Sequence, residues 1–116
     1  MKYTFGRTQA AQRLETLLEN SPSARRKVSS ILSDFNYKLI RIISAKDPNT
    51  VKLCWALLRD YTLKRIDAKK GLTDDMRSYA KNVLIYRYRV YLHNFNDIVA
   101  LLAAKRKGLT FGTEGV

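Results

Sequence analysis

The residue types on which catalysis and metal binding most often depend are scarce in this sequence. It contains one histidine, His93, and one cysteine, Cys54. A Cys/His metal site is therefore excluded, and a Cys–His nucleophilic pair would require these two isolated residues to meet. We expect instead a buried, inert thiol at Cys54, on the apolar face of a helix, and a polar residue at a helix bend for His93.

The acidic residues also lack a catalytic arrangement. None of the ten is paired with a second carboxylate at a spacing that suggests acid and base roles. Asp47 and either Asp74 or Asp75 are placed to cap helices, and Asp60 lies one turn from Lys64 as a solvated pair. No glycine-rich phosphate-binding pattern is present. We predict a protein without catalytic residues, metal or cofactor; a metal-dependent enzyme with scattered carboxylate ligands is the catalytic alternative.

Basic side chains are abundant and clustered. Lys and Arg number 22 against 10 Asp and Glu, and the formal net charge of +12 exceeds what solubility requires. Two clusters, ending at Lys70 and Lys107, fall at predicted helix ends, where cations also stabilise the helix dipole. Arg25, Arg26 and Lys27 instead fall in the first turns of a predicted helix, where cations are mildly unfavourable and a phosphate is stabilised. This cluster indicates an anionic partner.

Tyrosines are interleaved with further cations. Tyr37 lies among the cations of one predicted helix face, and Arg87 and Arg89 alternate with three tyrosines between residues 86 and 91. Cations neutralise phosphates, while arginine planes and tyrosine rings stack on sugars or bases. Core and interface packing is the alternative role for each tyrosine. The candidate nucleic-acid-binding residues are Arg25, Arg26, Lys27, Tyr37, Lys38, Arg41, Arg87, Arg89, Lys105, Arg106 and Lys107.

Helical periodicity and capping signals position these residues. A minor helix is predicted from about residue 8 to residue 18. At Ser21-Pro22 and again at Asp47-Pro48, a capping side chain precedes a proline at the first helical position, which predicts helices to about residues 45 and 70. The second of these stops at Gly71.

The segment from residue 73 to residue 107 contains the most apolar and aromatic stretch of the chain, residues 83–92. Its apolar residues fall on two opposite faces of a helix, which must then be covered on both sides. Tyrosine and valine alternate with arginine over residues 86–90, so a strand is the alternative, although it would have no sheet to join. Weak helix formers at residues 93–97 leave open whether the segment is one helix or two collinear or bent helices.

Both ends of the chain lack a helical repeat and are predicted to be short extended arms, at residues 1–7 and 108–116. They contain Tyr-Thr-Phe-Gly and Leu-Thr-Phe-Gly, and such peptides are a means by which small subunits grip neighbours. Together these patterns predict a single all-α domain, a small bundle of four main helices with the last one long or bent.

The sequence favours a protein that works inside a cell or within a virion. One cysteine cannot form an internal disulfide, and neither a signal peptide nor an apolar run of about 18 residues is present. A membrane-surface role is the third alternative, and no membrane partner is predicted, because the helices carry mixed faces without a strong basic amphipathic anchor. The function that we expect is non-catalytic nucleic-acid binding or packaging through sequence-independent phosphate contacts, with self-association as a homo-oligomer or as a subunit of a larger assembly.

The alternative function is that of a helical scaffold subunit, in a replication, transcription or RNA-guided effector complex, whose basic face binds an acidic protein or RNA. No groove-reading motif distinguishes DNA from RNA as the partner. In architecture alone, a small basic bundle with extended ends is similar to coat subunits of filamentous archaeal viruses and to small helical subunits of RNA-guided complexes. That likeness assigns no residues.

Overall fold

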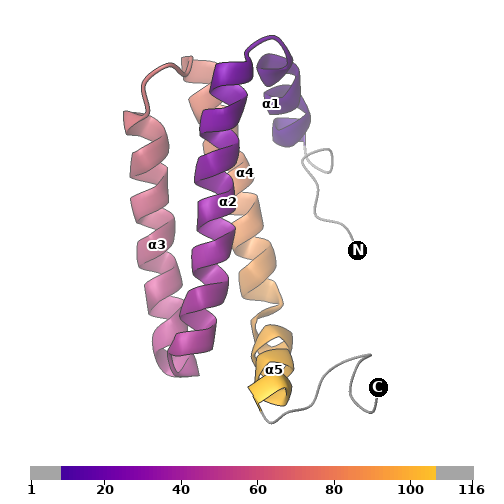
Figure 1. The fold of residues 1–116 in the computed structure, drawn as a ribbon, viewed down its shortest axis with the longest axis vertical. Coiled ribbons are helices and arrows are strands. Elements are labelled where there is room, and N and C mark those ends of the chain that lie inside the picture. The colour runs from indigo at the N-terminus through magenta and orange to yellow at the C-terminus, as the bar shows by residue number, and fades with distance from the viewer. Residues whose placement is uncertain (1–8, 107–116) are drawn as a thin grey trace.

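The computed structural model describes residues 9–106, and all regular elements in this range are helices (Figure 1). The two predicted arms lie outside the described residues. The all-α prediction is confirmed, and of the two alternatives for the long last segment the divided one is observed, so that residues 9–106 form five helices. They are α1 (Gln9–Glu19), α2 (Pro22–Ala45), α3 (Pro48–Ala68), α4 (Asp74–His93) and α5 (Phe95–Arg106).

The predicted start signals, Ser21-Pro22 and Asp47-Pro48, lie at the observed starts of α2 and α3. The Asp47 carboxylate caps α3 by accepting hydrogen bonds from the backbone N–H groups of Asn49 (3.0 Å) and Thr50 (3.2 Å) and from the Thr50 hydroxyl (3.0 Å). These hydrogen bonds lower the pKa of the Asp47 carboxyl group, and the bond from the Thr50 hydroxyl has the largest effect. Ser21 precedes Pro22 at the start of α2, but its side chain makes no capping bond. The proline alone therefore marks that start.

Asn94 divides the long segment into α4 and α5. Its backbone N–H and its side-chain Nδ2 both donate to the carbonyl of Val90, at 3.1 and 2.8 Å. The Asn94 side chain thus binds a carbonyl oxygen of α4 and competes with the backbone for it, which favours a break in the helix at this point. Residues 83–92 lie within α4, which excludes the strand alternative.

α2 and α3 run side by side as an antiparallel pair, and α4 packs against α1 and α3 (Figure 1). Trp55 of α3 is fully buried at the meeting point of four helices. Its Nε1–H donates to the carbonyl of Leu39 in α2 (3.0 Å), and its ring meets Tyr91 of α4 and Phe95 of α5 edge-on, with centroids 6.0 and 5.4 Å away. Trp55 therefore links the antiparallel hairpin of α2 and α3 to α4 and α5.

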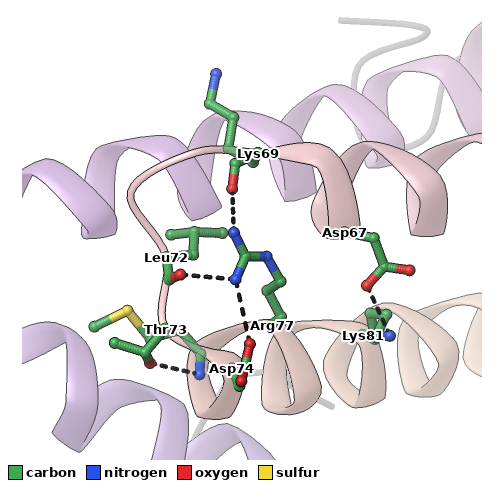
Figure 2. A network of polar contacts seen from close by, with 8 residues as sticks. Asp67, Lys69, Leu72, Thr73, Asp74, Arg77 and Lys81 are labelled. Atoms are coloured by element: carbon green, nitrogen blue, oxygen red, sulfur yellow. Dashed lines mark hydrogen bonds and ion pairs between the residues drawn. The ribbon is translucent and has the colours of Figure 1, made fainter.

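A guanidinium group of α4 braces the connection from α3 to α4. Arg77 of α4 donates to the carbonyls of Lys69 (2.7 Å) and Leu72 (2.8 Å) and lies 3.6 Å from Asp74 (Figure 2). Gly71 makes the turn with a φ of 89°, a conformation that is unfavourable for residues with a Cβ atom. The end of α3 and the start of α4 are thereby fixed relative to each other.

Candidate nucleic-acid interface

A continuous line of exposed side chains runs along α2, on the side opposite its buried residues. Its members are three or four residues apart and thus share one helix face, about 22 Å long from first to last. The line contains no acidic residue, and its serine hydroxyls can donate to phosphate oxygens. We call this surface the α2 track; it consists of Arg26, Ser30, Ser33, Tyr37 and Arg41, all of them exposed.

Tyr37 and Arg41 form a preassembled pair on the track. The guanidinium carbon of Arg41 lies 5.7 Å from the centroid of the Tyr37 ring, and Arg41 Nη1 donates a long hydrogen bond (3.4 Å) to the Tyr37 hydroxyl. The tyrosine is nevertheless 60% exposed. A cation and a solvent-exposed aromatic ring are therefore held together, which suits contact with a phosphate and a neighbouring base or sugar.

Lys27 and Lys38, by contrast, are engaged within the protein. Lys27 Nζ donates to the carbonyl of Lys70, near the start of the α3–α4 turn (3.1 Å). Lys38 Nζ pairs with Asp34 (3.1 Å), and the same carboxylate oxygen receives Nη1 of Arg65 from α3 (2.8 Å). The i, i+4 spacing of Asp34 and Lys38 is visible in the sequence, whereas the Lys27–Lys70 contact is not; both contacts reduce the free charge of the lysines.

Asp34 is the acidic residue that interrupts the basic face of α2. Burial raises the pKa of its carboxyl group, but the neighbouring Lys38 and Arg65 have the larger combined effect, so the net pKa is lowered. Asp34 thus stays ionised and neutralises part of the charge beside the α2 track.

Changing Asp34 to Asn should therefore strengthen nucleic-acid binding while weakening the fold slightly. Lys38 and Arg65 become free to contact phosphate, and we expect the affinity to rise severalfold at low salt. Each partly exposed pair contributes at most about 1 kcal/mol to the free energy of unfolding. Because the folded pKa of Asp34 is lowered, this contribution is present above the unfolded pKa of about 3.9 and is lost as the pH falls through the folded pKa.

Urea unfolding at pH 7 and at pH 3 checks the stability part of this prediction. The difference between the parent and the Asp34→Asn variant should be measurable at pH 7 and should narrow at pH 3. An unchanged or lower affinity of the variant would show that Lys38 and Arg65 do not face the nucleic acid.

The contact between Lys27 and Lys70 also brings two basic clusters together. The first turn of α2 lies beside the end of α3, because the two helices are antiparallel (Figure 1). Just after α3, Arg77 and Lys27 bind the carbonyls of Lys69 and Lys70, and the side chains of these two lysines are exposed. We call this cluster the basic end; it consists of Arg25, Arg26, Lys27, Lys69 and Lys70.

The remaining candidate residues lie elsewhere. Arg87 is half-buried on the inner side of α4, and its burial lowers the pKa of the guanidinium group, an effect partly offset by Tyr91. Arg89 is exposed on the opposite side of α4, so the arginines of the Tyr/Arg-rich stretch do not share a surface. Lys105 is exposed on α5, at the end of the molecule away from the start of α2 (Figure 1). Arg106 ends α5, and Lys107 lies outside the described residues.

α3 carries an exposed apolar stripe that the sequence pattern does not predict. Leu53, Leu57 and Tyr61 are 63%, 60% and 54% exposed and are spaced one turn apart. Cys54, predicted to be a buried thiol, is only half-buried. Lys38 Nζ lies 5.8 Å from the Tyr61 ring centroid, so the α3 stripe borders the basic face of α2.

The described residues offer little for other chemistry. An open cavity of about 260 Å³ between α1 and α4 is lined by Arg13, Thr16, Leu17, Asp75 and Tyr79, and Arg13 donates to the Tyr79 hydroxyl across it (3.2 Å). No group of three or more His, Cys, Asp or Glu side chains within residues 9–106 could hold a metal ion. None of the described helices is long and apolar enough to cross a membrane.

Comparisons with protein-family models, with characterised proteins and with solved structures found no match to this chain. Its function is therefore inferred from its own residues and their arrangement.

Proposed function

We propose that this protein binds nucleic acid non-catalytically and without sequence preference, as a packaging or nucleoprotein-like subunit that self-associates within a cell or a virion. The observation that carries the proposal is the α2 track, an exposed line of cations, hydroxyls and one aromatic ring without a carboxylate. The track shares Arg26 with the basic end, so the two surfaces are continuous. The net charge of +12 adds long-range attraction for a polyanion.

The residue types of the track determine the expected mode of binding. Arginine and serine side chains contact phosphate oxygens, which fix the position of a nucleic acid but carry no sequence information. Tyr37 is available to stack on a base or sugar, which is tolerant of sequence because every base has an aromatic face. Discrimination between sequences is therefore expected to be small.

Salt dependence tests the proposal directly. If six to ten phosphates are neutralised, the affinity should fall about 10³- to 10⁵-fold between 50 and 200 mM salt. Fluorescence anisotropy with labelled DNA and RNA oligonucleotides, each single- and double-stranded and of two unrelated sequences, measures this slope and identifies the preferred partner. Absence of binding at the lowest salt, or binding that salt does not weaken, would contradict the proposal.

The α3 stripe favours a second candidate function, that of a scaffold subunit for an acidic protein. Leucine side chains contribute little to phosphate recognition, whereas exposed apolar residues at one-turn spacing can pack against the apolar face of an amphipathic helix. Lys38 beside the stripe would favour acidic residues flanking the apolar face of that helix. The same anisotropy titration separates the two functions, because the scaffold alone predicts no affinity for oligonucleotides at low salt.

A further inference from the structure

α5 is an apolar helix that the other described residues, 9–94, cover incompletely. Phe95, at its start, is buried against Trp55, but no later side chain up to Lys105 is buried. Ile98, Val99 and Leu102 pack against the core only in part. Figure 1 shows α5 extending beyond α4 at one end of the molecule. Because a helix that is apolar on all sides must be covered on all sides, its outer face is expected to meet another chain.

The outer face of α5 has a simple order. Opposite Phe95 lie two small residues, Ala100 and Ala104, which permit close approach of a second helix, and Leu101, which is 44% exposed. Asp97 and Lys105, both exposed, lie four residues before and four residues after Leu101, in an i, i+4 row that turns from the side opposite Phe95 at Asp97 toward the side of Ile98 at Lys105. The row therefore carries opposite charges at equal distances from a central leucine.

The charge distribution argues that the occupant is a second copy of this chain. Two chains that each carry +12 repel one another, so they meet most easily where the surface is least basic. Residues 95–104 contain one ionic side chain, the acidic Asp97, and the basic Lys105 and Arg106 end the helix. The α3 stripe is a poorer surface for this purpose, because Lys38 and the exposed Lys64 lie on the same outer side of the hairpin.

We infer that the α5 helices of two chains pair in antiparallel orientation about Leu101, with Asp97 of each chain beside Lys105 of the other. The two residues lie about 6 Å along the axis on either side of Leu101, so a two-fold axis there brings both pairs into register. A parallel pair would instead place like charges together. One short helix on each side buries less than the roughly 1,200 Å² of a stable interface, so the dimer should be weak, with a dissociation constant in the micromolar range or above.

Charge exchange tests this pairing. Analytical ultracentrifugation from about 10 to 500 µM, without nucleic acid, should show a concentration-dependent dimer for the parent chain. Asp97→Lys and Lys105→Asp should each weaken it on the order of tenfold, because each creates two like-charge pairs across the axis. The double variant Asp97→Lys/Lys105→Asp should restore dimerisation to within a few fold of the parent. A parent that stays monomeric, or a double variant no better than the single variants, would overturn the inference.

Two further measurements keep the result unambiguous. Both substitutions oppose the helix dipole, so far-UV circular dichroism must show that α5 remains helical. Leu101→Lys leaves the two terminal charges in place and should abolish the dimer at the same concentrations, whereas a persistent dimer would exclude Leu101 from its centre. The inference extends the self-association of the proposed function, but it is measured without nucleic acid. Failure of the pairing and failure of nucleic-acid binding are therefore distinguishable.

Discussion

Replacing Arg26 and Arg41 together with glutamine should lower the affinity for every oligonucleotide about 10- to 100-fold near 0.1 M salt. The logarithmic salt slope should fall by about two, because two phosphate contacts are lost. Both side chains are exposed on the α2 track, and neither pairs with a carboxylate among the described residues. The free energy of unfolding should change by no more than about 0.5 kcal/mol. Anisotropy titrations at several salt concentrations measure both quantities.

A matched control separates the position of the charge from its amount. Lys52→Gln/Arg89→Gln removes the same two charges from exposed positions on α3 and α4, away from the track. Lys52, like Arg41, lies over an aromatic ring, with Nζ 4.9 Å from the Phe95 centroid. We expect the control to retain a salt slope within about half a unit of that of the parent. Equal losses in the two double variants would mean that net charge alone attracts the nucleic acid.

Part of this interface was predictable from the sequence. The cations of the first turns of α2 were singled out because they oppose the helix dipole, and periodicity alone places Arg26, Tyr37 and Arg41 on the polar face. Which cations are available depends on partners that are distant in the chain. Lys27 is bound to a carbonyl 43 residues away, and Arg65 meets Asp34 across the hairpin. Periodicity within one helix contains no information on such contacts.

The fold was more predictable than the site, for a physical reason. Helix starts depend on local chemistry, and Asp47 and Pro22 act within a single turn. The side chains that a helix buries depend instead on where its neighbours end. Tyr61 lies at the margin of the apolar arc of α3, and its neighbours leave it 54% exposed. The break at Asn94 was left open, because it required a specific side-chain bond to Val90.

Replacing Trp55 with alanine should have the largest effect on stability, a loss of about 3–5 kcal/mol in the free energy of unfolding. The substitution leaves a cavity and removes the edge-on contacts to Tyr91 and Phe95 and the hydrogen bond to the carbonyl of Leu39. Domains of this size are stable by about 5–15 kcal/mol, so the variant should be close to its unfolding threshold. Urea unfolding followed by far-UV circular dichroism measures the loss without relying on tryptophan fluorescence.

Two substitutions divide the role of Trp55 into its parts. Trp55→Phe keeps an aromatic ring against Tyr91 and Phe95 but lacks the indole N–H, so we expect a smaller loss of about 1–2 kcal/mol. Leu57→Ala, two residues along the same helix at a position 60% exposed, should cost no more than about 0.5 kcal/mol. Because Phe95 anchors α5 on the indole ring, Trp55→Ala should also weaken dimerisation through α5, whereas Leu57→Ala should not. If Trp55→Ala cost no more stability than Leu57→Ala, Trp55 would not be the residue that joins α2 and α3 to the last two helices.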